Sequence, residues 1–384
     1  MKRLRVGVLY GGRSGEHEVS LASAAAVFAN LNRQRYEPVP IRIEKDGRWL
    51  LADRPPTAAS AAEVIEQTRS EGSRARGGRE VFMLPRPGAE TLLAIDRRGS
   101  SGDDGAVATV TELHLDAIFP VLHGPYGEDG TIQGVLELAN VPYVGAGVLA
   151  SSVGMDKAVS KLVFAARKLP VGPYEVVMRS EWLAQPEAVG RMIAKHLGFP
   201  VFVKPANLGS SVGISKVADA SALPAAMNLA AEFDRKVIVE AAVPDAREIE
   251  VAVLGNDTPE ASVPGEIIPA REFYDYDSKY IDDRSQTIVP ADLRPADQQT
   301  IRRFAVEAFK AIDCCGMARV DFLLSRKTGK IYLNEANTIP GFTTISMYSK
   351  MWEASGLSYP ALLDRLIALA LERHAEKQQV RTSL

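Results

Sequence analysis

The chain contains little cysteine and no long apolar stretch. Only two of its 384 residues are cysteines, the neighbours Cys314 and Cys315. Adjacent cysteines rarely reach disulfide geometry with each other, and two thiols cannot cross-link a chain of this size. No run of about 18 apolar residues is present, so we expect no membrane-spanning helix. The cysteines are expected to be small, buried side chains in a reducing compartment, which favours a cytoplasmic protein.

A large excess of charge is also missing. The 45 Lys and Arg residues nearly balance the 48 Asp and Glu residues, and the formal net charge is −3. Nucleic acid or an anionic membrane is therefore not expected as a main partner, although a local basic pocket is allowed. Residues Met1–Arg5 are basic, but the apolar run after them is short and lacks a cleavage site, so we expect no secretory signal. The length and the 46% hydrophobic content predict two or three globular domains.

The opening of the chain predicts a βαβ unit. Leu4–Tyr10 is a short β-branched run, a helix is expected over Ala22–Leu31 with Ser14 or Ser20 as its cap, and Val39–Ile43 is expected to be a strand. Such a unit favours a parallel sheet. The Gly-Gly-Arg-Ser-Gly loop after the first strand is not the G-x-G-x-x-G motif, so the pattern argues against a dinucleotide site.

The segment 53–108 has a different composition. Ala, Arg, Ser, Gly and Pro dominate, and periodicity is weak. We interpret it as a helical excursion and a surface hairpin inserted into the first domain, without a function of its own. Further strands are expected at Ala117–Leu122, Val201–Pro205, Val212–Lys216, Val237–Val243 and Ile249–Leu254. Further helices are expected at Thr131–Ala139, Ser151–Lys168, Glu187–His196, Ala296–Ile312 and Pro360–Lys377.

A predicted hairpin near the C-terminus carries the most informative polar side chains. Strands at Met317–Leu324 and Lys330–Asn334 flank a polar turn, and folding about that turn places Asp321 opposite Glu335 and Arg319 opposite Asn337. Two facing carboxylates repel each other, and a divalent cation would remove that repulsion. Asp, Glu and Asn are oxygen ligands of the kind that Mg²⁺ takes when it also holds phosphates.

Alternation also places Leu333 on the Glu335 side of its strand. The alternative is a solvated hairpin surface with Arg–Asp and Glu–Asn pairs. The loop that follows, 336–344, supplies backbone N–H groups and hydroxyls, which favours the cation site over this alternative.

A second candidate element is a glycine-serine loop between two strands, 206–213. Its backbone N–H groups could lie over phosphates, although it is not a Walker A motif. Lys204 ends an apolar strand, where a lysine needs an anionic partner. Glu240 likewise lies within an apolar strand and needs a partner or a ligand hydroxyl. Glu248 is expected to pair with Arg247 or to bind a ribose.

Two further features could serve the same phosphates or cover them. Lys157 and Lys161 lie one helical turn apart, and each is otherwise expected to be a surface side chain. The polar, aromatic segment Pro269–Pro290 has no periodicity, and a segment of this kind within a compact domain is more often a functional loop or lid than a connector.

Taken together and in their order along the chain, seven motifs resemble those of the ATP-grasp superfamily and, within it, of the D-alanine–D-alanine ligase family. The resemblance covers nearly the whole chain, and seven motifs in one order are far more specific than any one of them. The motifs are GGRSGEHEVSL at 11–21, HGPYGEDG at 123–130, MDK at 155–157, KPANLGSSVGIS at 204–215, EFYDYDSKY at 272–280, ARVDF at 318–322 and NEANTIPGFT at 334–343.

The resemblance implies an α/β and α+β architecture, the ATP-grasp fold with an N-terminal Rossmann-like parallel-sheet domain. It implies three domains: residues 1–147 with the insertion at about 53–108, residues 148–243 with the phosphate loop, and residues 244–384 with the lid and the metal site. It also implies ATP as substrate and two Mg²⁺ ions, with Mn²⁺ as an alternative ion. A homodimer is common in the family.

The resemblance assigns roles to individual residues. The nucleotide ligands it implies are Lys157, Lys204, Ser211, Glu240 and Glu248, and the metal ligands are Asp321, Glu335 and Asn337. Glu16 would anchor the ammonium group of the first D-alanine, with Ser210 and Tyr280 fixing its carboxylate and the lid and with His123 beside it. The implied oxyanion donors are Arg319 and the N–H of Gly341. Lys279 and Ser346 would hold the carboxylate of the second D-alanine.

The implied reaction makes D-alanyl-D-alanine, a peptidoglycan precursor, through a D-alanyl-phosphate. It needs no protein nucleophile, and no Ser-His or Cys-His arrangement is evident. In the family, ligases that make D-alanyl-D-lactate carry another residue in place of Tyr280, so its presence favours a dipeptide product. The alternatives are D-lactate or D-serine as acceptor, another ATP-grasp carboxylate–amine ligase, and a non-catalytic nucleotide-binding protein, against which the intact metal set speaks.

Overall fold

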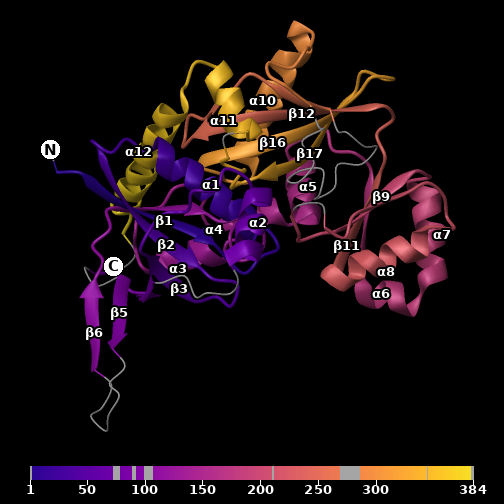
Figure 1. The fold of residues 1–384 in the computed structure, drawn as a ribbon. Coiled ribbons are helices and arrows are strands. Elements are labelled where there is room, and N and C mark those ends of the chain that lie inside the picture. The colour runs from indigo at the N-terminus through magenta and orange to yellow at the C-terminus, as the bar shows by residue number, and fades with distance from the viewer. Residues whose placement is uncertain are drawn as a thin grey trace. The chain divides into compact units, whose positions relative to one another are not determined.

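The computed structural model describes residues 2–71, 78–88, 92–98, 107–209, 212–268, 286–343 and 345–381. The chain divides into two compact units (Figure 1). The first unit comprises Met1–Val148, Gly255–Thr258 and Ile339–Leu384, and the second comprises Leu149–Leu254 and Pro259–Thr338.

The first unit is built on one sheet with helices packed against it. Its strands are β1 (Leu4–Gly11), β2 (Tyr36–Ile43), β3 (Trp49–Ala52), β4 (Gly78–Met83), β5 (Leu92–Arg98), β6 (Val107–Glu112) and β7 (Ala117–Val121). Its helices are α1 (His17–Asn30), α2 (Ala61–Glu71), α3 (Thr131–Leu138), α11 (Met347–Ala354) and α12 (Tyr359–Lys377).

The predicted βαβ opening is confirmed. Strand β1 pairs in parallel with β2 on one side and with β7 on the other. Its apolar run is buried because the strand is central, as expected for a parallel strand covered on both faces. Helix α1 begins at His17 without a side-chain cap, so the prediction that Ser14 or Ser20 caps it is wrong. The Ser20 hydroxyl instead accepts from Gly11 N at 2.7 Å and ties the helix to the end of β1.

The 53–108 segment enlarges this sheet. It contains helix α2 and the antiparallel hairpin of β5 and β6, as predicted. However, β3, β4, β5 and β6 pair successively and continue the β2 edge, so the described part of the sheet runs β6-β5-β4-β3-β2-β1-β7. In Figure 1 the β5–β6 arm extends beyond the helices that flank the sheet. The added strands begin at the β2–β3 turn, where Gly47, with a φ of +93°, lets the chain return antiparallel to β2.

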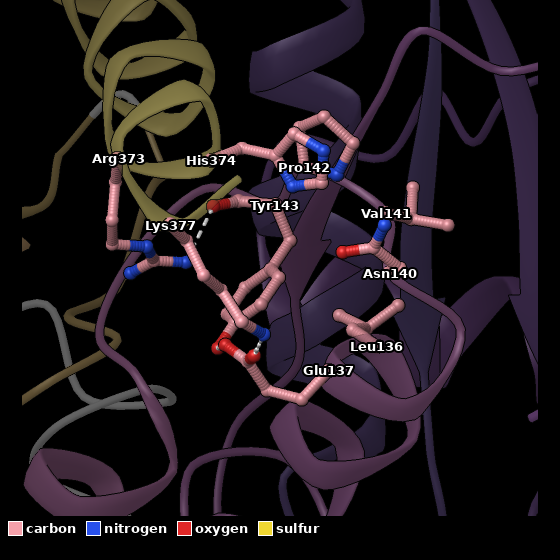
Figure 2. A pocket seen from close by; sticks show the side chains of 9 residues that line it. All are labelled: Leu136, Glu137, Asn140, Val141, Pro142, Tyr143, Arg373, His374 and Lys377. Carbon is pink, nitrogen blue, oxygen red and sulfur yellow. Dashed lines mark hydrogen bonds and ion pairs between the residues drawn. The ribbon is translucent and has the colours of Figure 1, made fainter. Parts of the chain in front are cut away.

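The C-terminal helix α12 is fastened to the first unit by a cluster of polar contacts (Figure 2). The Arg373 guanidinium stacks on the Tyr143 ring, 4.3 Å from its centroid, and donates to the Gly145 and Tyr143 carbonyls. Lys377 pairs with Glu137, which also accepts from the Tyr143 hydroxyl at 2.7 Å. These groups line a small pocket, where they bind one another. Their contacts link α12 to residues 137–145, which agrees with the grouping of residues 339–384 with the N-terminal segment in one unit.

The second unit contains two sheets. Its strands are β8 (Tyr174–Met178), β9 (Val201–Pro205), β10 (Ser215–Val217), β11 (Lys236–Ala241), β12 (Ala246–Gly255), β13 (Glu260–Ala261), β14 (Gly265–Ile268), β15 (Gln286–Ile288), β16 (Gly316–Ser325) and β17 (Ile331–Asn337). Its helices are α4 (Val148–Met155), α5 (Lys157–Ala166), α6 (Arg179–Ala184), α7 (Pro186–His196), α8 (Leu223–Phe233) and α10 (Pro295–Ala311).

The described part of the smaller sheet has the order β10-β9-β11-β8, and its paired strands are antiparallel. Alternate residues of β9 and β11, such as Val203 and Val239, are fully buried against α7 and α8. Strand β10 begins at Ser215, three residues later than predicted, and residues 212–214 form part of the loop. Lys204 lies opposite Ile238 and Glu240 lies opposite Phe202, so the two charged residues are diagonal neighbours on paired strands.

The second sheet has the path β15-β14-β12-β16-β17 with β13 beside β12 in the described residues. The β16–β17 hairpin was predicted, but it contains a bulge between Asp321 and Phe322. Beyond the bulge Phe322 lies opposite Leu333, and both side chains are buried. The prediction that Leu333 shares a side with Glu335 is therefore wrong, because the extra residue in β17 reverses the alternation.

The predicted helix Ser151–Lys168 is two helices. Helix α4 ends at Met155 and α5 begins at Lys157, because the Asp156 carboxylate caps α5 by accepting from Ala158 N and Val159 N. Cys314 is buried, as expected, whereas Cys315 is only half-buried, and neither forms a disulfide within the described residues.

The two sheets of the second unit fall on either side of residue 243. The predicted division into three domains stays a prediction. The placement of 339–384 with the first unit differs from the predicted 244–384 domain. Among the described helices, no single one is long and apolar enough to cross a membrane, and the α11–α12 pair that passes on composition is bent by 103°.

Candidate active site

The predicted site residues that the structure describes fall into one set in each unit. The first unit carries Glu16, His123, Gly341 and Ser346. The second unit carries Lys157, Lys204, Glu240, Glu248, Arg319, Asp321, Glu335 and Asn337. Four predicted residues, Ser210, Ser211, Lys279 and Tyr280, lie outside the described residues, as does most of the predicted lid.

The polar face of the β16–β17 hairpin has the predicted register. Asp321 lies opposite Glu335, and Arg319 lies opposite Asn337. Two guanidinium nitrogens of Arg319 donate to Asp321, with Nε–Oδ1 at 2.7 Å and Nη2–Oδ2 at 2.6 Å. The Asn337 amide also donates to Asp321 Oδ2 at 2.9 Å. Four polar side chains from two strands therefore meet on one surface.

Glu250 is a member of this group that the sequence interpretation missed. It lies on β12, which neighbours β16, and its buried carboxylate approaches Arg319 with Oε2–Nε at 3.2 Å. Burial alone would lower the pKa of Arg319, but Asp321 and Glu250 outweigh it and hold that pKa well above its ordinary value. Alternation with Glu248 on the same strand is the sequence signal that could have revealed Glu250.

The donor set fits a divalent cation. Within the described ranges, no group of three or more His, Cys, Asp and Glu side chains is arranged to hold a metal. The predicted metal ligands include only two carboxylates, those of Asp321 and Glu335, and the Asn337 amide is the third oxygen donor. Because Glu250 also contacts Arg319, the guanidinium would keep a carboxylate partner if Asp321 turned to a cation. The residues thus match the hard oxygen ligands of Mg²⁺.

Buried lysines surround Glu240. Lys204 Nζ lies 2.5 Å from Glu240 Oε2, and Lys161 Nζ lies 2.9 Å from Oε1. Burial would raise the pKa of Glu240, but Lys161 and Lys204 outweigh it and lower the pKa to about 2. Burial would likewise lower the pKa of Lys204, yet Glu240 and Glu335 hold it above its ordinary value. Glu240 and Lys204 are therefore both charged at neutral pH, and the cluster contains lysines of the kind that bind phosphates.

Other predicted nucleotide ligands are also placed near this cluster. Glu248 contributes to the raised pKa of Lys204, which places its charge close by. Arg247 forms a two-pronged ion pair with Glu266 at 2.8 and 2.6 Å rather than with Glu248. Lys157 and Lys161 are buried, which argues against the alternative that they are surface side chains.

The base of the phosphate loop is tied to the start of α5. Lys157 Nζ donates to the Leu208 carbonyl at 2.6 Å and lies 3.9 Å from Glu335. The Asn207 amide donates to Asp156 at 3.0 Å, and its backbone N–H donates to Asp234 at 2.8 Å. The loop is therefore anchored immediately before residue 210.

In the first unit, Glu16 sits at the start of α1. The Glu16 backbone N–H donates to the Ser14 hydroxyl at 3.2 Å, and that hydroxyl donates to the His123 carbonyl at 2.6 Å. Gly124 has a φ of +73°, and a Cβ there would lie 2.5 Å from Glu16 Oε2. A side chain at Gly124 would displace the Glu16 carboxylate, and the positive φ also favours glycine, so the two N-terminal motifs fit together at this point.

His123 is buried and both ring nitrogens have partners. Nδ1 lies 3.2 Å from the Ile339 carbonyl, and Nε2 lies 3.1 Å from the Ser23 hydroxyl. Ser23 Oγ also accepts from Phe342 N at 3.2 Å. Within the first unit, residues 339–342 are thus bound to α1 and to the segment that follows β7.

The loop after Ile339 carries Gly341 and leads to Ser346, which precedes α11. Ser346 Oγ accepts from Thr343 N at 2.9 Å, and a Cβ on Gly341 would lie 3.1 Å from it. The Tyr359 hydroxyl donates to the Phe342 carbonyl at 2.5 Å. The loop backbone is therefore held by side chains from three helices or their ends.

Comparison with known proteins gives the family. The model described as D-ala D-ala ligase N-terminus matches residues 5–146, and the model described as D-ala D-ala ligase C-terminus matches residues 163–368. A D-alanine–D-alanine ligase of Heliobacterium modesticaldum is 49% identical over 99% of this chain and 98% of its own length. The chain belongs to the D-alanine–D-alanine ligase family.

Solved structures of the same family agree. The D-alanine–D-alanine ligase of Coxiella burnetii has a TM-score of 0.78 and 37% identity, covering 99% of this chain and 97% of its own. The VanG D-Ala:D-Ser ligase of Enterococcus faecalis has a TM-score of 0.76 and 34% identity, covering 96% and 100%. The predicted ATP-grasp fold and the family resemblance are confirmed, and ATP and a divalent metal are used in this family.

Proposed function

We propose that this protein joins two D-alanines to D-alanyl-D-alanine at the expense of ATP, for peptidoglycan precursor synthesis. The observation that carries the proposal is the β16–β17 hairpin, whose register brings together Arg319, Asp321, Glu335 and Asn337 in a chain of this family. A carboxylate is a poor electrophile, so a ligase of this kind needs a site that handles phosphates and a site that handles an oxyanion.

The reaction balances without a protein nucleophile. A carboxylate oxygen of the first D-alanine bonds to the γ-phosphorus of ATP, and the bond from that phosphorus to ADP breaks. The amine of the second D-alanine then bonds to the acyl carbon and loses a proton, while the acyl C–O bond breaks and phosphate leaves with the carboxylate oxygen. In the transition state of the first half-reaction, negative charge must be stabilised on the phosphoryl group. In the second half-reaction, it must be stabilised on the acyl oxygen.

The second unit carries the side chains for the first charge. Asp321, Glu335 and Asn337 would hold two Mg²⁺ ions, with Mn²⁺ as an alternative, and these ions would neutralise phosphate charge. Lys157 and Lys204 would contact the phosphates, together with the backbone and Ser211 of the loop. Glu240 and Glu248 would accept from the adenosine. The support for these assignments is the burial of Lys157 and Glu240 and the ion-pair cluster around Glu240.

The remaining side chains would bind the amino acids. Glu16 would hold the ammonium group of the first D-alanine, because a buried carboxylate favours a cation. Arg319 and the Gly341 N–H would face the acyl oxyanion. Ser210 and Tyr280 would fix the first carboxylate and the lid, and Lys279 and Ser346 would hold the carboxylate of the second D-alanine.

The acceptor is a separate question from the chemistry. The Enterococcus faecalis relative is a D-Ala:D-Ser ligase, so D-serine is the second candidate acceptor, and D-lactate is the third. Tyr280 favours the dipeptide. We expect Tyr280→Phe to raise the share of D-alanyl-D-lactate, and an unchanged product ratio would separate the lid from acceptor choice. A homodimer and a cytoplasmic location are further proposals that rest on the family.

Phosphate release tests the function. Purified protein with Mg-ATP is expected to release phosphate only when D-alanine is present, because the acyl-phosphate forms on its carboxylate. Incubation with D-alanine, D-serine and D-lactate together, followed by mass spectrometry, then identifies the acceptor. Release without any amino acid, or with D-lactate alone, would contradict the proposal.

A further inference from the structure

A buried hydrogen-bond chain joins three segments of the first unit. The Phe342 N–H donates to Ser23 Oγ at 3.2 Å, Ser23 Oγ lies 3.1 Å from His123 Nε2, and His123 Nδ1 lies 3.2 Å from the Ile339 carbonyl. Ser23 is fully buried and His123 nearly so. Ser23 comes from α1, His123 follows β7, and the two backbone groups lie on either side of Pro340 and Gly341.

The direction of each hydrogen bond follows from the atoms. A carbonyl oxygen can only accept, so His123 Nδ1 carries a proton and donates to Ile339. Ser23 Oγ already accepts the Phe342 N–H, and its own proton needs an acceptor in a fully buried place. His123 Nε2 is that acceptor when it carries no proton. The chain is complete only with a neutral imidazole protonated at Nδ1.

The chain holds the two ends of a short backbone segment. His123 binds the carbonyl that precedes Pro340, and Ser23 binds the N–H that follows Gly341. Between them lies the peptide group that bears the Gly341 N–H. The proline ring restricts φ at 340, and Ser346 leaves little room at Gly341. The direction of the Gly341 N–H is therefore set largely by these two side chains.

We propose that Ser23 is a positioning residue, and that it fixes His123 in the Nδ1–H tautomer so that the pair aims the Gly341 N–H at the oxyanion. The expected effect on turnover rests on the proposed function. His123 would likewise be a positioning residue and would not transfer a proton to the substrate. Both of its ring nitrogens bond protein groups. A misdirected oxyanion donor loses much of its effect, since its value depends on distances of about 3 Å.

The tautomer is measured directly by NMR of protein labelled with ¹⁵N-histidine. His123 is one of five histidines and is assigned by the signal that disappears in His123→Gln. The expected state at neutral pH is a neutral ring with the proton on Nδ1, and Ser23→Ala is expected to shift it towards the Nε2–H form. A wild-type ring that is protonated on Nε2 would overturn the proposal, whether or not the protein proves to be a ligase.

Kinetics test the positioning role. Ser23→Ala is expected to lower kcat by about 10- to 100-fold, while KM for ATP stays unchanged because the described ATP-ligand candidates lie in the other unit. Ser23→Cys keeps a weak donor, and its kcat is expected to lie between those of the wild type and Ser23→Ala. If kcat of Ser23→Ala stays at the wild-type value while the tautomer shifts, the proposal is overturned.

A matched variant separates positioning from loss of packing. Ser20→Ala removes a hydroxyl that is equally buried, lies on the same helix and bonds Gly11 N and the Val121 carbonyl. It is expected to lower stability while leaving the His123 tautomer unchanged. A tautomer shift in Ser20→Ala as large as in Ser23→Ala would overturn the specific role of Ser23.

Discussion

Asp321 and Glu335 lie directly opposite each other on the β16–β17 hairpin, with their side chains on the same surface. Neither carboxylate is deeply buried, and each has a cation near it: Arg319 bonds Asp321, and Lys157 lies 3.9 Å from Glu335. Facing carboxylates destabilise a strand pair unless positive charge is placed between or beside them. We propose that a divalent cation binds beside this pair and, through it, phosphates.

Removing one charge of this pair tests the metal site. Glu335→Gln is expected to lower turnover by about 100-fold or more, because an amide binds Mg²⁺ far more weakly than a carboxylate, while the fold survives. Turnover at increasing Mg²⁺ and a thermal unfolding curve are the measurements. Glu187→Gln, on an exposed surface of α7, is the control and should leave both unchanged. Near-normal turnover in Glu335→Gln would mean that the hairpin is only a solvated surface.

Glu250 tests how Arg319 is shared. In Glu250→Gln the guanidinium keeps Asp321 as its charged partner and binds it more firmly, so a metal must compete harder for that carboxylate. We expect the Mg²⁺ concentration for half-maximal activity to rise several-fold, together with a lower kcat.

The control for this prediction is another buried pair on the same sheet. Glu266→Gln breaks the Arg247–Glu266 pair and should reduce stability without changing the Mg²⁺ requirement. Equal Mg²⁺ requirements in Glu250→Gln and the wild type would refute the shared-partner account.

The sequence predicts the hairpin register because a short polar turn and two alternating strands leave one natural pairing. It does not predict the bulge at Asp321 and Phe322, because one extra residue in a strand leaves no compositional mark, and the side of Leu333 was wrong for that reason. The break at Asp156 could have been predicted, since aspartate is a favoured N-cap. Ser23 could not, because a buried serine in an alanine-rich helix has no charge or spacing that signals its partner.

Glu240 makes stability depend on pH in a defined range. Its pKa is lowered to about 2 from an ordinary value of 4.5, so its stabilising effect is complete above pH 4.5 and is lost as the pH falls towards 2. Glu240→Gln leaves Lys161 and Lys204 buried without their carboxylate and is expected to cost about 3–5 kcal/mol at pH 7. Denaturant unfolding should show this difference shrinking between pH 4.5 and 2. A difference that is constant over this range would contradict the assigned pKa.

Asn207 tests the anchoring of the phosphate loop. Asn207→Ala removes the amide that bonds Asp156, and a looser loop is expected to raise KM for ATP by about 3- to 10-fold with a smaller change in kcat. Asn228→Ala, which removes a side-chain bond to Trp182 in the same part of the chain, is the control for lost stability. If both variants change KM for ATP equally, the loop is not held through Asn207.

An oxygen label tests directly whether the reaction passes through an acyl-phosphate. D-alanine with ¹⁸O in both carboxylate positions is incubated with Mg-ATP and the protein, and the released phosphate is analysed by mass spectrometry. Because the carboxylate oxygen bonds to phosphorus and leaves with it, each phosphate is expected to carry one ¹⁸O atom. Phosphate without ¹⁸O, released while D-alanyl-D-alanine accumulates, would contradict the account.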